Sequence, residues 1–127
     1  MPEQALRAHP DAIGEARGYV RDRLAGVLPP PKLYEAELLT SELVTNAVRH
    51  ANVGEEAVIQ IRIEVEPRTV QVSVVDAGEG FDLLKVVPRS PDDGEGGGWG
   101  LFLIEKLADR WGVDSSPPHR VWFEIDR

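Results

Sequence analysis

A glycine-rich loop that runs straight into a helical pattern constrains this chain more than any other feature. The stretch from Gly94 to Trp111 reads GEGGGWGLFLIEKLADRW, with five glycines in its first seven residues. Apolar residues then recur at helical spacing and predict one face of a helix: Leu101, Ile104, Leu107, Ala108 and Trp111. Glycine lets the backbone approach a ligand, and the unpaired N–H groups of a first helical turn carry partial positive charge, so this arrangement can hold a phosphate. A surface loop before an ordinary amphipathic helix has the same pattern.

Composition bounds the class of protein. With 127 residues, of which 42% are hydrophobic and 28% charged, residues 1–127 have the size and composition of one soluble globular domain. No apolar run reaches the ~20 residues of a membrane span, and the first ten residues lack the apolar core of a signal peptide. We therefore expect a cytoplasmic protein without a membrane partner.

The charged and metal-binding residue types exclude further functions. The chain has no cysteine, which excludes disulfides, thiol catalysis and thiolate metal sites, and its three histidines have no zinc-ligand spacing. A formal net charge of −8 disfavours direct binding to nucleic acid, because phosphate backbones attract clusters of Lys and Arg. The expected partner is a small molecule or another protein.

Two helices are expected in the first half of the chain. The first begins at Asp11, which can cap it, and is stopped by the three prolines at 29–31. Its apolar residues recur at helical spacing: Ile13, Ala16, Val20, Leu24 and Leu28. The second runs from about Leu33 to Ala51 without an internal glycine or proline. Its core stripe is expected to comprise Ala36, Leu39, Leu43 and Ala47.

The second helix also carries polar residues in an unusual place. Glu42 and Asn46 are four residues apart, so they lie one turn apart on the same face, and Arg49 and His50 follow one turn later. Asn is unfavourable inside a helix, and here it stands among apolar residues. A carboxylate and an amide that line a pocket can do acid–base chemistry and hold a metal ion through an oxygen. A solvated polar stripe has the same spacing, and this helix alone does not separate the two interpretations.

The rest of the chain predicts a hairpin, a long connection, the third helix and one or two strands. Residues 57–65 and 69–75 alternate as strands around the turn 66–68, and the second strand leads into the carboxylate of Asp76 and a Gly-x-Gly turn, a pattern also common in plain turns. The connection 82–98 has the length of a functional cover or a disordered loop.

The ends of the chain complete the expected architecture. Gly112 is expected to cap the third helix, followed by a short strand at 113–115 and a last strand at 120–126, while residues 5–8 fit a short edge strand. This order predicts an α+β fold, a two-layer α/β sandwich with helices on one face of a mixed, mostly antiparallel sheet.

Three segments together resemble the ATP-binding boxes of the gyrase, Hsp90, histidine-kinase and MutL ATPase superfamily. They are ELVTNAVRHA (42–51), DAGEGF (76–81) and GGGWGLFLI (96–104), in the family's order and with its approximate separation. With LADRWGV after the glycine box and VWFEI at the end, the chain looks most like the anti-sigma-factor serine kinases. The resemblance covers residues 11–125 and implies a Bergerat-type ATP-binding fold with an ATP lid at about 82–99.

The resemblance implies roles for three side chains. Asp76 stands where the family's Asp accepts a hydrogen bond from the adenine amino group, and a carboxylate at that place would repel the carbonyl oxygen of guanine. Asn46 stands at the position of the Mg²⁺ ligand. Glu42 stands at the position of the general base, which orients and deprotonates an attacking hydroxyl.

Further residues are implied to lie around the nucleotide. Gly78 and Gly80 would let the backbone pass close to the base, and Gly96, Gly98 and Gly100 would lie at the phosphates. Arg49 or Arg89 can neutralise phosphate charge, and of the two we select Arg49. Leu101 and Ile104 would pack behind the nucleotide.

Two positions depart from the family pattern. Many members have a Thr two residues before the Val of the last strand, near the adenine-binding Asp, and this chain has His119 there. A water-bridged contact to the base would be altered or missing. The lid also contains Asp92, Asp93 and Glu95, whose negative charge opposes a triphosphate unless these residues face solvent or share the cation.

The resemblance implies ATP and Mg²⁺ as cofactors and a regulatory serine/threonine protein kinase. Such a protein binds a sigma factor, phosphorylates an anti-anti-sigma (STAS-domain) partner on Ser or Thr and, by analogy, forms a homodimer. The alternative is a nucleotide-dependent protein-binding module with little or no kinase activity, because holding ATP and reacting it use the same residues. A histidine kinase or a mechanical ATPase is disfavoured, since we expect no room for a phosphoacceptor hairpin or a transducer domain.

Overall fold

Eight helices and strands make up the part of the chain that the computed structural model describes, which comprises residues 3–7, 9–50, 58–76, 99–114 and 119–127. In chain order they are β1 (Glu3–Arg7), α1 (Asp11–Leu24), α2 (Pro30–His50), β2 (Val58–Val65), β3 (Thr69–Asp76), α3 (Trp99–Leu107), β4 (Arg110–Asp114) and β5 (His119–Asp126). The predicted hairpin is confirmed within one residue at each described end, and β1 supplies the edge strand slightly earlier than predicted. None of the described helices is long and apolar enough to cross a membrane.

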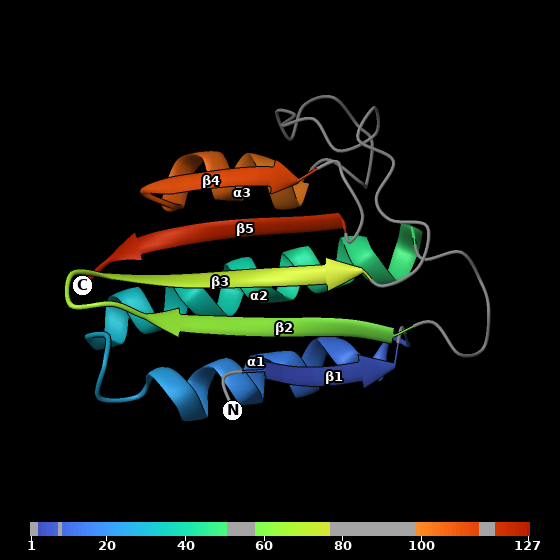
Figure 1. Ribbon diagram of the computed structural model, residues 1–127, viewed down its shortest axis with the longest axis horizontal. Helices are drawn as coiled ribbons and strands as arrows, with labels where there is room; N and C mark the ends of the chain where they lie inside the picture. Colours follow the sequence, from blue (N-terminus) through green and yellow to red (C-terminus); the bar gives the residue numbers. More distant parts are fainter. Residues whose placement is uncertain (1–2, 8, 51–57, 77–98, 115–118) are drawn as a thin grey trace.

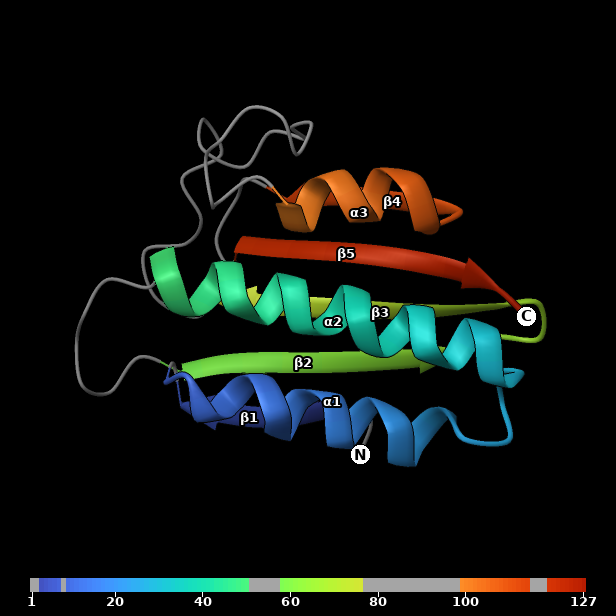
Figure 2. The ribbon, with the colours of Figure 1, turned by 180° about the vertical axis from the view of Figure 1, so that it is seen from behind.

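The strands form one five-stranded sheet in the order β1-β2-β3-β5-β4. Figure 1 shows the sheet from its bare face, and Figure 2 shows that all three helices cover the other face. The α+β sandwich with helices on one face is therefore confirmed. The sequence predicted a mixed, mostly antiparallel sheet, whereas all pairings between the described strands of the sheet are antiparallel, because β5 lies between β3 and β4 and runs opposite to both.

The hydrophobic core lies between the helices and the covered face of the sheet. Alternate residues of the central strands face it: Val70, Val72 and Val74 from β3, and Val121, Phe123 and Ile125 from β5. The predicted core stripe of α2 is confirmed, since Ala36, Leu39, Leu43 and Ala47 are all buried. Each buried Val, Leu, Ile or Phe side chain contributes about 1.5–3 kcal/mol relative to exposure, so this layer holds α2 on the sheet.

The first helix begins at the predicted residue but with a different cap. Asp11 is the first helical residue, and its backbone N–H donates to Nδ1 of His9 at 3.2 Å. The expectation that Asp11 itself caps the helix is therefore wrong. The residue before it is Pro10, which makes no side-chain capping bond.

The first helix also ends one turn earlier than predicted. α1 ends at Leu24, and Gly26 follows with a φ of 85°, in the left-handed region that favours glycine. Leu28 is buried as expected, but it lies in the connection rather than on the helix. The prolines do not stop α1 directly; instead Pro30 begins α2, where its missing N–H leaves no bond unmade.

The third helix is shorter than predicted, and the strand after it is longer. α3 ends at Leu107, so Trp111 lies in β4 rather than on the helix, although it still packs against the core. The predicted cap, Gly112, is also a strand residue. The reason is tertiary: the N–H of Asp109 donates to the carbonyl of Glu124 at 2.9 Å, which starts the ladder with β5 before a further helical turn can form.

Gly112 lies directly opposite Trp122, whose indole ring crosses the glycine. A Cβ at position 112 would lie 2.6 Å from Cζ2, 2.7 Å from Cε2 and 2.9 Å from Nε1 of that ring. In contrast, a Cβ on Gly14 in α1 would meet nothing within 4 Å. The ring of Trp122 therefore leaves no room for a side chain at Gly112, whereas nothing near Gly14 requires a glycine.

We expect Gly112→Ala to lower the free energy of unfolding by about 1–3 kcal/mol, because the indole ring must leave its place. Gly14→Ala is the matched control and should raise it by about 0.5–1 kcal/mol, because alanine is the better helix former and meets no neighbour. Urea unfolding of both variants measures the difference. Equal stabilisation by both substitutions would contradict the crossing of Trp122 over Gly112.

Candidate functional site

Four chain segments meet at one end of the sheet. The C-terminal half of α2, the end of β3, the start of α3 and the start of β5 lie there in both views (Figures 1 and 2). β5 starts where β3 ends because the two strands are antiparallel. α3 has nine residues and leads into β4 at the opposite end of the sheet, so the first turn of α3 returns to this end. We call this region the strand-end site.

Asp76 is the last residue of β3 and stands in the middle of the sheet. Its ladder partners are Ile59 on β2 and His119 on β5. The sequence predicted a carboxylate at the end of a strand, and the register adds that His119 is its direct neighbour. The departure from the family pattern at position 119 therefore falls beside the residue implied to bind adenine.

Glu42 and Asn46 lie one turn apart on α2, as predicted. Asn46 is buried, with 6% of its surface exposed, and Glu42 is half-buried. Glu42 and Asn46 therefore do not form a fully solvated polar stripe on α2. Arg49 lies in the last turn of the same helix.

The remaining predicted site residues divide between α3 and segments outside the described residues. Gly100 and Leu101 belong to the first turn of α3, which contains no acidic residue. The other glycines implied to contact the nucleotide, Gly78, Gly80, Gly96 and Gly98, lie outside the described residues, as do lid residues 82–98.

An ion pair fixes α2 against α1. Nε and Nη2 of Arg21 donate to Oε1 of Glu37 at 3.1 and 2.7 Å, and Glu37 is buried while Arg21 is largely exposed. This hydrogen bond, together with the carboxylate charge, raises the pKa of the Arg21 guanidinium. The pair lies about one turn before Glu42 and holds the part of α2 that leads into the strand-end site.

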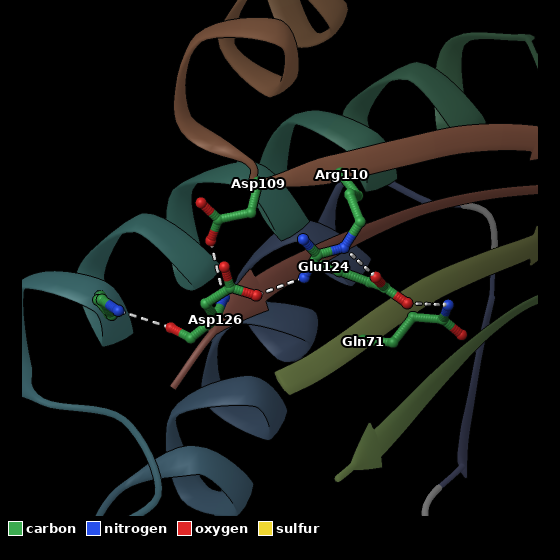
Figure 3. A network of polar contacts seen from close by, with 6 residues as sticks. Gln71, Asp109, Arg110, Glu124 and Asp126 are labelled. Carbon is green, nitrogen blue, oxygen red and sulfur yellow. Dashed lines mark hydrogen bonds and ion pairs between the residues drawn. The ribbon is translucent and has the colours of Figure 1, made fainter. Parts of the chain in front are cut away.

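A polar network anchors the far end of α3 (Figure 3). The guanidinium of Arg110 pairs with the carboxylates of Glu124, at 2.7 Å, and Asp126. Gln71 donates to Glu124 at 3.1 Å, and the carboxylate of Asp109 accepts the N–H of Asp126 at 2.7 Å. In the same network Lys32, near the start of α2, donates to the carbonyl of Asp126 at 2.6 Å.

No motif in the sequence predicts this network. In the sequence, the network is visible only as alternate polar residues in the last strand. The register between β4 and β5 is needed to show which charged side chains pair. The two carboxylates raise the pKa of Arg110, so the guanidinium stays charged. The network therefore fixes the corner between α3 and β4 at the end of the sheet opposite to the strand-end site.

Three hydroxyl-bearing residues surround Glu42 on α2. Ser41 donates to the carbonyl of Leu38 at 3.0 Å, and Thr45 donates to the carbonyl of Ser41 at 2.6 Å. Thr40 is fully buried, and its hydroxyl has no hydrogen-bond partner among the described residues. A buried hydroxyl without a partner is destabilising.

The fold and the position of these residues on it define the class of protein. A solved structure of the mycobacterial sensor histidine kinase MprB has the same fold, with a TM-score of 0.54 over 98% of this chain and 97% of that one, at 14% sequence identity. The chain belongs to the histidine kinase-like ATPase domain family, whose model matches residues 6–122. The superfamily resemblance seen in the sequence is confirmed.

Within that class the chain is similar to RsbW-type proteins. It is 33% identical to the serine-protein kinase RsbW of Oceanobacillus iheyensis, in an alignment that spans 84% of this chain and 74% of that protein. It is 36% identical to the serine-protein kinase RsbW of Staphylococcus aureus, over 65% of this chain and 58% of that protein. The chain thus matches little more than half the length of the Staphylococcus aureus relative.

We expect Thr40→Val to raise the free energy of unfolding by about 1 kcal/mol, because valine has nearly the same shape and leaves no buried hydroxyl without a partner. Thr45→Val is the matched control on the same helix and should bring no gain, because it removes a hydroxyl that donates a bond. Urea midpoints at unchanged slope measure both effects. A loss of stability in Thr40→Val would show that this hydroxyl has a partner.

Proposed function

We propose that this chain is an ATP-dependent protein serine/threonine kinase that acts as a cytoplasmic anti-sigma factor. In this proposal it binds a sigma factor and phosphorylates a Ser or Thr of an anti-anti-sigma partner. The observation that carries the proposal is the buried amide of Asn46 one turn from the half-buried carboxylate of Glu42, at the end of the sheet where β3 ends in Asp76. The names of the RsbW relatives support the same activity.

The residues of the strand-end site fit a magnesium nucleotide. Mg²⁺ usually takes one or two oxygens from the protein and the rest from phosphates and water, so one buried amide oxygen from Asn46 suits it. When bound, the ion would neutralise phosphate charge and orient the phosphates. Asp76 would accept a hydrogen bond from the adenine amino group, and the first-turn N–H groups of α3 would face the phosphates without an opposing acidic residue.

In the proposed transfer, the carboxylate of Glu42 takes the proton of the partner's serine or threonine hydroxyl. The hydroxyl oxygen forms a bond to the γ-phosphorus, and the bond from the γ-phosphorus to the bridging oxygen breaks, so that ADP leaves. Half-burial suits this role, because Glu42 must meet a hydroxyl from another protein and still lie close to the nucleotide.

We expect Glu42→Gln to reduce partner phosphorylation by about 10²–10⁴-fold and to leave the affinity for ATP nearly unchanged, because it removes the base and keeps the shape. Glu35→Gln is the matched control, since Glu35 is also half-buried and lies two turns earlier on α2. Transfer of labelled phosphate to an anti-anti-sigma protein measures the rate. Unchanged phosphorylation in Glu42→Gln would contradict the kinase mechanism.

A wild type that binds ATP and its partners but transfers no phosphate would instead support the alternative of a nucleotide-dependent protein-binding module. The phosphate-transfer assay thus separates the two functions. A second measurement, the affinity for the partner with and without ATP, shows whether the nucleotide controls partner binding.

We expect Asp76→Asn to weaken ATP binding by about 10- to 100-fold, because the carboxylate is the proposed acceptor for the adenine amino group. Calorimetry with ATP and with GTP, each with and without Mg²⁺, measures the affinity. The wild type should bind ATP in preference to GTP, and Asp22→Asn, an exposed carboxylate on α1, should behave as the wild type. Equal binding of ATP by wild type and Asp76→Asn would remove Asp76 from the site.

A further inference from the structure

Two hydroxyl side chains bond to the backbone of α2 on either side of Glu42 in the sequence. Oγ of Ser41 donates to the carbonyl of Leu38 at 3.0 Å, and Oγ1 of Thr45 donates to the carbonyl of Ser41 at 2.6 Å. Both residues are two positions from Leu43, about 200° around the helix, so they lie on the side of α2 opposite to the core stripe. Side-chain bonds of this kind compete with the helical hydrogen bonds and bend a helix.

Both bonds act on the peptide unit that joins Ser41 to Glu42. In an α-helix each carbonyl accepts the N–H of the residue four positions later, so the carbonyl of Leu38 is also the acceptor for the N–H of Glu42. The carbonyl of Ser41 and the N–H of Glu42 belong to one planar group. The hydroxyl of Thr45 therefore bonds to one end of this plane, and the hydroxyl of Ser41 shares the acceptor at the other end.

These bonds are not common to all hydroxyl residues in this part of α2. Thr40 is fully buried, and its hydroxyl has no hydrogen-bond partner among the described residues, although the carbonyl of Ala36 is four positions earlier. Ser41 is buried as well, with 8% of its surface exposed, and Thr45 is half-buried. The two hydroxyls that bond to the backbone are thus the two that act on the peptide unit of Glu42.

We propose that Ser41 and Thr45 are positioning residues that aim the carboxylate of Glu42 at the hydroxyl of the protein substrate. This inference rests on the proposed function, because it takes Glu42 as the base of the phosphate transfer. The core stripe fixes which way this part of α2 faces, and the tilt of the peptide plane sets the direction of the Cα–Cβ bond of Glu42 within it. In this role neither hydroxyl touches the nucleotide or the substrate.

The step that depends most on this direction is the transfer of the proton. A general base must lie within hydrogen-bond reach of the proton that it takes, and a misplacement of about 1 Å can cost about 100-fold in rate. Asn46 is buried and is held by packing, whereas Glu42 is half-buried and depends more on the backbone for its direction. Loss of the two hydroxyl bonds should therefore affect phosphate transfer more than binding of the magnesium nucleotide.

The test compares Thr45→Val, which removes the hydroxyl and keeps the branched shape, with Thr45→Ser, which keeps the hydroxyl. Thr45→Val should lower the kcat for transfer of labelled phosphate from ATP to a STAS-domain anti-anti-sigma protein by about 3- to 30-fold. The KM for that protein and the affinity for ATP with Mg²⁺ should stay within about twofold of the wild type. Thr45→Ser should keep most of the wild-type kcat, and Ser41→Ala should lower it as Thr45→Val does.

Thr40→Val is the matched control, since it removes the neighbouring hydroxyl, for which the described residues offer no partner. It should transfer phosphate with the kcat of the wild type. Urea unfolding of each variant separates a loss of folded protein from a loss of rate.

An unchanged kcat in Thr45→Val, or an equal loss in Thr40→Val, would overturn the inference and leave the proposed function intact. A loss in Thr45→Ser as large as in Thr45→Val would also overturn it, because packing rather than the hydroxyl would then matter. A higher KM for the anti-anti-sigma protein at unchanged kcat would place Thr45 in contact with that partner and overturn the positioning role. A wild type that transfers no phosphate would overturn the proposed function and this inference with it.

Discussion

The packing of α2 across the helix-facing residues of the sheet is the contact on which the rest of the structure depends. Leu43 and Ala47 are buried in that contact, and Glu42 and Asn46 each precede one of them by a single residue. One residue of helix is a rotation of about 100°, so burial of the apolar stripe fixes the direction in which the polar pair lies. The candidate site is therefore oriented by the hydrophobic core rather than by contacts of its own.

The polar contacts of the structure support this arrangement from outside the strand-end site. Arg21 and Glu37 tie α1 to α2 before the polar pair begins, and the network around Arg110 fixes the corner after α3. These bonds lie outside the strand-end site and support the elements that lead into it. Because its C-terminal end is held in this way, α3 presents its first turn, with its unpaired N–H groups, toward the strand-end site.

The comparisons separate what the fold implies from what the site implies. A sensor histidine kinase shares the fold at 14% identity, and a fold shared at that level hosts more than one function. The RsbW relatives are 33–36% identical, and their names point to phosphoryl transfer onto a protein side chain. On this chain the proposal for function therefore rests on Asn46, Glu42 and Asp76, and the fold supplies their positions.

The sequence by itself determined the helices and strands whose hydrophobic period is long and unambiguous, namely α2 and the hairpin of β2 and β3. It also determined that Glu42 and Asn46 share a helix face, because that follows from 3.6 residues per turn alone. It did not determine the end of α3, since Leu107 and Trp111 fit a helical spacing while Trp111 and Val113 equally fit a strand, and only the pairing of β4 with β5 separates the two.

The direct ladder partner of Asp76 was likewise decided by tertiary structure, whereas the family resemblance placed position 119 only near Asp76. Forty-two residues separate it in the chain from His119, and no local pattern encodes the register that makes them partners. The same holds for Gly112, which is a glycine because Trp122 crosses it from the next strand. Short-range periodicity fixes which face a residue occupies, but the burial of the whole sheet fixes which residues on that face meet.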